Sequence, residues 1–291
     1  MIKKKNKAIL CAIASVGFMT SIKTINVNAM TPKNTELVSN IQGINQDNEI
    51  ENTNSNNYFS DIKDHWAKKD IENPLGMLKW HANYFDSYVN IRIANICGSC
   101  GKKAIPLAIL GADVTVFDIS EDNRKYALEV AAAANVHIDY EVCDVLEINT
   151  EKYRDYFDVV FMEGGILHYF HDINEFMSVM NSLLKPNGKM ICSDFHPFTK
   201  IADILSFEQP NMSYFSTDVF EGEMAHARFF EEKIRKQMPK CLYRKYTISE
   251  IINSIINCGF TLKKFDEHPA WTNEKIPGEF TVVATKRISS C

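Results

Sequence analysis

The sequence lacks an excess of positive charge. Its 291 residues carry a formal net charge of -5, so no broad basic field would attract a polyanion. We therefore do not expect nucleic acid as the main partner, although a local basic patch remains possible, and we expect a small molecule instead. With 45% hydrophobic and 24% charged residues, the chain is long and apolar enough to bury a substantial core.

The sequence also lacks a disulfide framework. Most of its 8 cysteines stand in apolar runs typical of buried strands or helices. Cys97 and Cys100 have the C-x-x-C spacing of a redox motif or of half a zinc site. No second pair and no histidine pair follows at ligand spacing. We predict no metal site and keep a redox or metal role for this pair as the weaker alternative.

The start of the sequence offers no comfortable membrane span. Four lysines between residues 3 and 7 precede an apolar run from Ala8 to Met19, which is too short for a permanent anchor. Val27, Asn28 and Ala29 provide small residues for a signal peptidase. We predict a signal peptide over residues 1–29 and an exported or envelope-associated chain. An amphipathic or disordered leader on a cytoplasmic protein is the alternative.

Aromatic residues are missing from residues 30–57, which are rich in Asn, Glu, Ser and Thr. Such a segment buries too little surface to offset the entropy of ordering, so we predict a disordered linker. Residues 58–90 follow as an N-terminal helical segment. Their start, 58–72, resembles the opening of an S-layer homology motif, although no internal repeat is visible. An amphipathic helix that packs Trp66 and Ile71 on the main domain is an equal alternative.

Strand and helix patterns alternate from Ile91 onward, which predicts βαβ units and a mostly parallel sheet. We predict an α/β domain over residues 91–291, with a Rossmann-like seven-stranded sheet flanked by helices and a terminal antiparallel strand pair. The expected strands are 91–96, 114–117, 137–142, 157–162, 189–193, 260–265 and 279–284. Residues 195–246 are too long for a plain connection, so we predict a lid insertion that covers a ligand.

Helix-start signals support two of the expected helices. Asp172 with Glu175 precedes an apolar stripe that Pro186 ends, and Thr247 with Glu250 forms a capping box.

Polar residues follow most of the predicted strands. In an open parallel sheet, ligands bind beyond the carboxyl ends of the strands. A carboxylate after the second strand suits two ribose hydroxyls, which favours a nucleoside cofactor. A nicotinamide-dependent oxidoreductase shares this acid, but no third glycine follows Gly101 at the G-x-G-x-x-G spacing. The strand-end residues are Asn95 with the Gly98 turn, Asp118, Asp144, Glu163 and Asp194.

The order and spacing of these residues resemble those of the class I S-adenosylmethionine-dependent methyltransferases over about residues 75–285. The resemblance implies S-adenosylmethionine as cofactor, with Asp118 at its ribose and Asp144 at its adenine. The GSxG turn followed by KKA, and the DFHP sequence from Asp194 to Pro197, resemble a bacterial branch of unassigned substrate. The implied cofactor-binding residues are Asn95, Ile96, Gly98, Ser99, Gly101, Asp118, Ile119, Asp144, Val145, Glu163 and Gly164.

The turn departs from that family's pattern. Asn95 stands where the family has an acid, and Cys97 and Ser99 stand where it has glycines. Asn95 still accepts a hydrogen bond but supplies no charge, so we predict weaker cofactor binding than in an enzyme with an acidic turn.

Methyl transfer displaces a thioether that needs no proton, so the enzyme mainly supplies position and a desolvated pocket. A general base is needed only for a hydroxyl or a protonated amine. We predict His168, Asp194 and His196 as catalytic residues that meet an unidentified small-molecule acceptor. The alternative for each residue is a structural role, and a third hypothesis for the chain is a non-catalytic exported envelope protein that has kept the fold.

Overall fold

The computed structural model describes residues 55–202, 213–222, 232–236, 240–271 and 273–288. The predicted signal peptide, 1–29, lies outside these residues. The predicted linker, 30–57, lies outside them as well, except that α3 (Ser55–Glu72) takes in its last three residues. In the described ranges, no helix combines the length and the apolar character that a membrane crossing needs.

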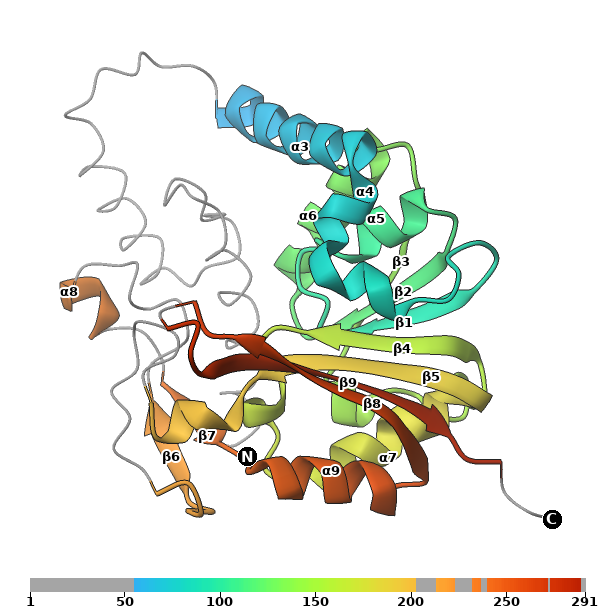
Figure 1. Cartoon of the computed structure of the whole chain (residues 1–291). Coiled ribbons are helices and arrows are strands. Elements are labelled where there is room, and N and C mark those ends of the chain that lie inside the picture. The colour runs from blue at the N-terminus through green and yellow to red at the C-terminus, as the bar shows by residue number, and fades with distance from the viewer. Residues whose placement is uncertain (1–54, 203–212, 223–231, 237–239, 272, 289–291) are drawn as a thin grey trace.

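A seven-stranded sheet forms the centre of the protein (Figure 1), in the order β3-β2-β1-β4-β5-β9-β8. The first five strands in this order run parallel to one another, and β9 is antiparallel to both β5 and β8. The predicted fold class is therefore confirmed. The strands are β1 (Arg92–Ile96), β2 (Asp113–Asp118), β3 (Asp139–Val142), β4 (Phe157–Glu163), β5 (Leu184–Phe195), β8 (Phe260–Pro269) and β9 (Pro277–Lys286).

Helices cover both faces of the sheet (Figure 1). On one face lie α3, α4 (Pro74–Leu78), the 3-10 helix η3 (Lys79–Tyr84), α5 (Ala104–Ile109) and α6 (Glu121–Ala133). On the other lie α7 (Ile173–Leu183) and α9 (Ile248–Asn257). Each face has its own hydrophobic core: the first lies beneath α5 and α6, and the second lies beneath α7 and α9. Successive strand residues point to opposite faces, so Val116 packs in the first core and Phe117 in the second. Each such fully buried large side chain contributes about 2 kcal/mol through burial.

The predicted helix starts are present. Asp172 accepts hydrogen bonds from the backbone of Asn174 and Glu175, and Thr247 forms the full capping box with Glu250. The helix α7 ends at Leu183, before Pro186, because Leu184 already pairs with Phe157 of β4. The last two strands are longer than predicted, because they pair with each other over almost their whole length.

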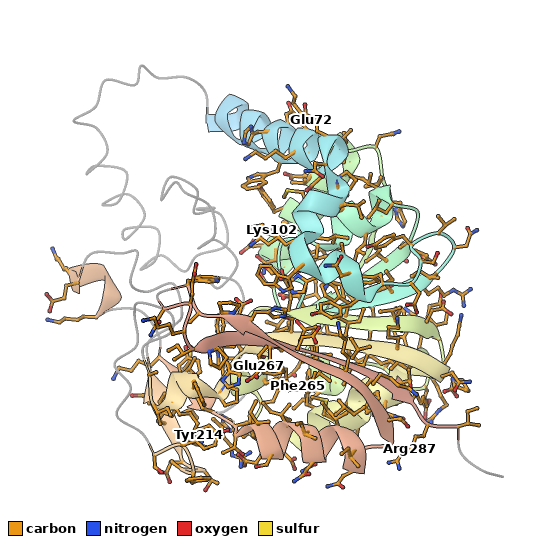
Figure 2. The ribbon with its side chains drawn as sticks, viewed as in Figure 1. Glu72, Lys102, Tyr214, Phe265, Glu267 and Arg287 are labelled. Atoms are coloured by element: carbon orange, nitrogen blue, oxygen red, sulfur yellow. The ribbon has the colours of Figure 1, made fainter. Side chains whose placement is uncertain are left out.

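The N-terminal segment packs on the main domain. Ala67 of α3 is buried in the first core, and α3 contacts α5 and α6. The ammonium of Lys102 (Figure 2) lies 5.6 Å from the centre of the Trp66 ring. Residues 58–72 therefore belong to one helix, and Trp66 packs on the main domain as the second interpretation predicts. Ile71, the other residue predicted to pack there, is 52% exposed, so that part of the prediction is wrong.

The lid insertion adds a small antiparallel sheet of β6 (Val219–Gly222) and β7 (Cys241–Arg244). It also contains the 3-10 helix η6 (Pro197–Lys200) and the short helix α8 (Glu232–Arg235). Residues 203–212, 223–231 and 237–239 of the insertion lie outside the described ranges.

Candidate functional site

The turn after β1 has the backbone conformation of a glycine-rich loop, although it contains few glycines. Cys97 and Ser99 have φ angles of 49° and 53°, in the left-handed region, and Gly101 has 77°. At Gly98, an added Cβ would lie 2.5 Å from Asn95 Oδ1 and 2.8 Å from Val116 Cγ1. Only glycine fits at that position, whereas Cys97 and Ser99 each cost about 1 kcal/mol in backbone strain.

Asp118 anchors this turn to the end of β2. Its Oδ2 accepts the backbone N–H of Ser99 at 3.0 Å, and its Oδ1 accepts the backbone N–H of Ser120 at 3.0 Å. The hydroxyl of Tyr140 on β3 donates to the carbonyl of Ser99 at 2.7 Å. Burial raises the pKa of the Asp118 carboxyl, and these backbone donors oppose the rise. The ends of β1, β2 and β3 are thus tied together at Ser99.

The next predicted residues also gather at this edge. Asp144 Oδ1 accepts the N–H of Leu146 at 3.0 Å and starts the 3-10 helix η4 (Val145–Glu147), and Val145 is buried beneath it. Ile119 is half-buried beside Asp118. Ile96 is fully buried in the core on the α7 face, so only its backbone is available to a ligand.

Asn95 presents a buried acceptor beneath the turn. Its side chain is 2% exposed, and Nδ2 donates to the carbonyl of Phe161 at 3.4 Å. Its Oδ1 has no hydrogen-bond partner among the described residues. An unpaired buried acceptor typically costs about 1–3 kcal/mol, which marks this oxygen as a position for an incoming donor.

Glu163, at the end of β4, lies between two buried cationic or basic side chains. Its Oε1 is 3.7 Å from Lys103 Nζ, and its Oε2 is 3.4 Å from His81 Nδ1. Lys103 also donates to the carbonyl of Met77 at 2.6 Å. Lys103, from the KKA sequence after the turn, therefore links the turn to both α4 and β4. The neighbouring Gly164 is exposed and donates its N–H to the carbonyl of Ser193 at 3.1 Å.

Asp194 shapes the loop that follows β4. Its Oδ2 accepts the N–H groups of Ile166 at 2.9 Å and Leu167 at 2.7 Å, and its Oδ1 accepts that of Phe195 at 2.6 Å. Desolvation raises the pKa of the carboxyl to about 6, against the lowering effect of these donors. This geometry gives Asp194 a structural role, and its catalytic role stays a prediction.

His168 lies among aromatic rings on the 3-10 helix η5 (Leu167–Tyr169). Its ring centre is 4.2 Å from that of Tyr169 and 5.1 Å from that of Tyr243 of β7. The ring of Phe195 lies nearly parallel to it at 6.5 Å. Desolvation, with a smaller contribution from Lys245, lowers the pKa of His168 to about 3. The ring is therefore neutral at pH 7 and borders the lid insertion.

Both ring nitrogens of His196 face protein groups. Nδ1 accepts the N–H of Phe198 at 3.2 Å, so the proton of the neutral ring is on Nε2. Nε2 lies 3.0 Å from Glu267 Oε1 on β8 (Figure 2). A role for His196 as a base would require this capping contact to break. That role also stays a prediction.

The N-terminal segment contributes residues that the sequence patterns do not indicate. His81 and Trp80 come from η3, upstream of the sheet, and Lys103 stands in the sequence only as part of the KKA signature. Trp80 and His81 stand together in a short aromatic stretch between the linker and the first strand. That stretch is the only local signal that these side chains would cover the carboxyl edge of β4.

Comparisons with known proteins agree with this architecture. The family model described as "Methyltransferase domain" matches residues 93–188. A ubiquinone biosynthesis O-methyltransferase from Bradyrhizobium diazoefficiens is 34% identical over 103 residues, which are 35% of this chain and 39% of that protein. A ubiquinone/menaquinone biosynthesis C-methyltransferase from Rickettsia massiliae is 29% identical over 155 residues, which are 48% of this chain and 60% of that protein.

A solved structure has the same fold. The S-adenosylmethionine-dependent methyltransferase from Mesorhizobium loti superposes with a TM-score of 0.55 at 19% identity, over 72% of this chain and 97% of that one. The likeness to this structure shows the fold alone. The chain spans about half the length of the two curated relatives named above.

Proposed function

We propose that this chain is an S-adenosylmethionine-dependent methyltransferase that transfers a methyl group to a small molecule, because a methyltransferase domain model matches residues 93–188 and the curated relatives named above are methyltransferases. The observation that carries the proposal is the turn after β1, held in a left-handed backbone by Asp118 at the carboxyl edge of the sheet. Nucleoside cofactors bind at this edge in doubly wound sheets.

The residues present fit S-adenosylmethionine. The unpartnered, buried Oδ1 of Asn95 suits the cofactor's ammonium group, and a Cβ at Gly98 would fill the space beside that oxygen. The carboxylate of Asp118 has about four lone-pair positions, of which backbone and Asn123 donors use three, so it can accept from one ribose hydroxyl and not from the two expected. Asp144 and Val145 would border the adenine. When bound, the cofactor supplies a methyl group on a positively charged sulfur. Once the methyl group is transferred, the sulfur leaves as a neutral thioether that needs no proton.

The site borders the lid insertion on one side. His168, Tyr169 and Tyr243 present ring surfaces there, and ring surfaces suit an apolar or planar small molecule. The named relatives are an O-methyltransferase and a C-methyltransferase. They support a small-molecule acceptor without choosing between an oxygen and a carbon.

Binding to the full chain tests the cofactor assignment. Isothermal titration calorimetry with S-adenosylhomocysteine, and separately with NAD, distinguishes the methyltransferase from the oxidoreductase alternative. We expect one site for S-adenosylhomocysteine and no heat from NAD. Binding of NAD alone would favour the oxidoreductase, and binding of neither would favour the non-catalytic envelope protein.

We infer separately that the chain is exported, because its four early lysines, the apolar run Ala8–Met19 and the small residues before Met30 have the pattern of a signal peptide. Cell fractionation with N-terminal sequencing tests this inference. We expect a chain outside the cytosol that begins at Met30, whereas an intact leader in the cytosol would contradict it.

A further inference from the structure

His81 is held in a single tautomer by its neighbours. Its side chain is 2% exposed, and Nδ1 lies 3.1 Å from the carbonyl oxygen of Leu78. A carbonyl oxygen only accepts hydrogen bonds, so the proton is on Nδ1. Glu163 Oε2 lies on the same side of the ring, 3.4 Å from Nδ1. In the neutral ring, the lone pair is therefore on Nε2.

That lone pair is buried without a partner. Among the described residues, nothing forms a hydrogen bond with His81 Nε2, and the same holds for Trp80 Nε1 and Asn95 Oδ1. Seven buried side-chain atoms lack a hydrogen-bond partner in the described residues; these three belong to η3 and β1, and the other four belong to Asp70, Asn181, His196 and Ser254. Asn95 pairs in register with Phe161, whose ring centre is 5.6 Å from that of His81. Unpaired buried polar atoms are rare in folded proteins. Asn95 Oδ1 is assigned above to the cofactor, and the two unpaired atoms of η3 indicate a second polar group beside it at the carboxyl edge of β1 and β4.

Few charged groups face His81. Glu163 comes from β4, Lys103 from the start of α5 and His268 from β8. Lys103 lies on the far side of the same carboxylate, 3.7 Å from Glu163 Oε1. Glu163 thus lies between a cation and the Nδ1 side of the His81 ring, whose N–H is held by the Leu78 carbonyl. In this arrangement a backbone carbonyl orients the imidazole, and the carboxylate charge favours its protonated form.

We propose that His81, its Nδ1–H held by the Leu78 carbonyl, is the general base that removes the proton of a hydroxyl acceptor through Nε2, and that Glu163 is the positioning residue whose charge stabilises the imidazolium. This inference rests on the proposed methyl transfer. A base serves a hydroxyl or a protonated amine acceptor; we commit to the hydroxyl, and a thioether acceptor would present no proton to remove.

The step balances without a further reactant. As the acceptor O–H bond breaks, its proton passes to His81 Nε2 and its electron pair forms the bond from oxygen to the methyl carbon. The electron pair of the broken carbon–sulfur bond stays on sulfur, which becomes a neutral thioether. The imidazolium then carries the positive charge beside Glu163, and loss of its proton to solvent resets the base.

The ionisation of His81 is compatible with this role. Desolvation lowers its pKa to about 4, the Glu163 charge acts in the opposite direction, and Lys103 lowers it further. The ring is thus neutral and able to accept a proton at neutral pH. Because Glu163 supports the charged form, Glu163→Gln lowers the pKa of His81 still further.

Nuclear magnetic resonance of the histidine rings in the full chain, without cofactor, tests the geometry. We expect His81, assigned by its loss in His81→Gln, to have its proton on Nδ1 and to titrate near pH 4. Glu163→Gln should move that titration to lower pH, whereas Asp139→Asn should not. Asp139 makes the matched control because it lies 3.2 Å from the exposed His137. A proton on Nε2, or no shift in Glu163→Gln, would overturn the proposal.

Turnover tests the chemistry. The probes are small catechols and hydroquinones, with their dimethyl ethers as blanks that lack any hydroxyl. We expect methylation of oxygen, a loss of at least 100-fold in kcat for His81→Gln, and an unchanged Kd for S-adenosylhomocysteine. His137→Gln should keep wild-type turnover.

Other results would overturn the proposal in separable ways. Turnover of His81→Gln within threefold of wild type would remove the base and leave the proposed function intact. Methylation of carbon, or of none of these probes by a chain that binds S-adenosylhomocysteine, would remove the hydroxyl acceptor. A wild-type chain that does not bind S-adenosylhomocysteine would end the proposed function and this inference together.

Discussion

Ser99 donates its backbone N–H to Asp118 Oδ2 at 3.0 Å, although Ser99 itself stands in the left-handed region at a φ of 53°. The contact joins the turn after β1 to the end of β2. Since Tyr140 of β3 binds the carbonyl of the same residue, three strand ends are fixed through one serine. The turn is thus in place before any ligand binds.

The strain at Ser99 can be measured. Glycine has no Cβ penalty at positive φ, so Ser99→Gly should raise the free energy of unfolding by up to about 1 kcal/mol. Ser178→Gly, on the exposed face of the right-handed helix α7, should lower it by about 0.5–1 kcal/mol. Urea denaturation of both variants measures whether the free energy of unfolding rises or falls relative to wild type. A Ser99→Gly variant less stable than wild type would contradict backbone strain at this turn.

Asn95 should limit affinity for the cofactor. Asn95→Asp places a carboxylate where the turn now has a neutral oxygen, and a charge-assisted hydrogen bond to an ammonium is about twice as strong as a neutral one. We expect about tenfold tighter binding of S-adenosylhomocysteine by calorimetry, together with lower stability of the free protein, because the new charge is buried. Weaker binding of S-adenosylhomocysteine by Asn95→Asp than by wild type would show that the cofactor's ammonium group does not lie beside Asn95. Sub-micromolar affinity of the wild-type chain would contradict the expected effect of the neutral turn.

Asp70 should make stability depend on pH. It is buried in α3, and desolvation raises the pKa of its carboxyl from 3.8 to about 7, against the attraction of Lys102 and Lys103. Between these values the folded chain binds one more proton than the unfolded chain, so the stability that this group contributes falls as the pH rises. Asp70→Asn removes that loss.

Urea denaturation at several pH values checks this sign. We expect the stability advantage of Asp70→Asn over wild type to grow by about 2 kcal/mol between pH 5 and pH 8. An advantage that is the same at both pH values would show that Asp70 ionises normally in the folded chain.

The sheet could be predicted from the sequence because its signals are local. Alternating apolar runs, the caps at Asp172 and Thr247, and the acids after the strands depend on residues within a few positions of one another. The structure therefore confirms the fold, and it brings Asp118 and Asp144 to the same edge as Asn95.

The base candidate could not be predicted in this way. His81 meets Glu163 across 82 positions of chain, by the difference of their numbers, and only the packing of η3 on β4 brings them together. Conversely, His196 and Asp194 stand where a catalytic residue would be expected, but His196 accepts a backbone N–H of its own loop, and Asp194 accepts backbone N–H groups of the loop after β4. Whether a polar side chain at a strand end faces a ligand or its own backbone depends on the loop conformation, which residue spacing does not specify.

The most direct test of the central claim, that the Asn95–Gly101 turn and Asp118 bind S-adenosylmethionine, is the Kd of S-adenosylhomocysteine for two matched variants. Asp118→Asn removes the acid at the turn. Asp158→Asn changes a carboxylate that also accepts a backbone N–H, that of Arg92 at 2.9 Å, but at the opposite ends of β1 and β4. We predict at least tenfold weaker binding in Asp118→Asn and a Kd within twofold of wild type in Asp158→Asn; equal binding by both variants would contradict the account.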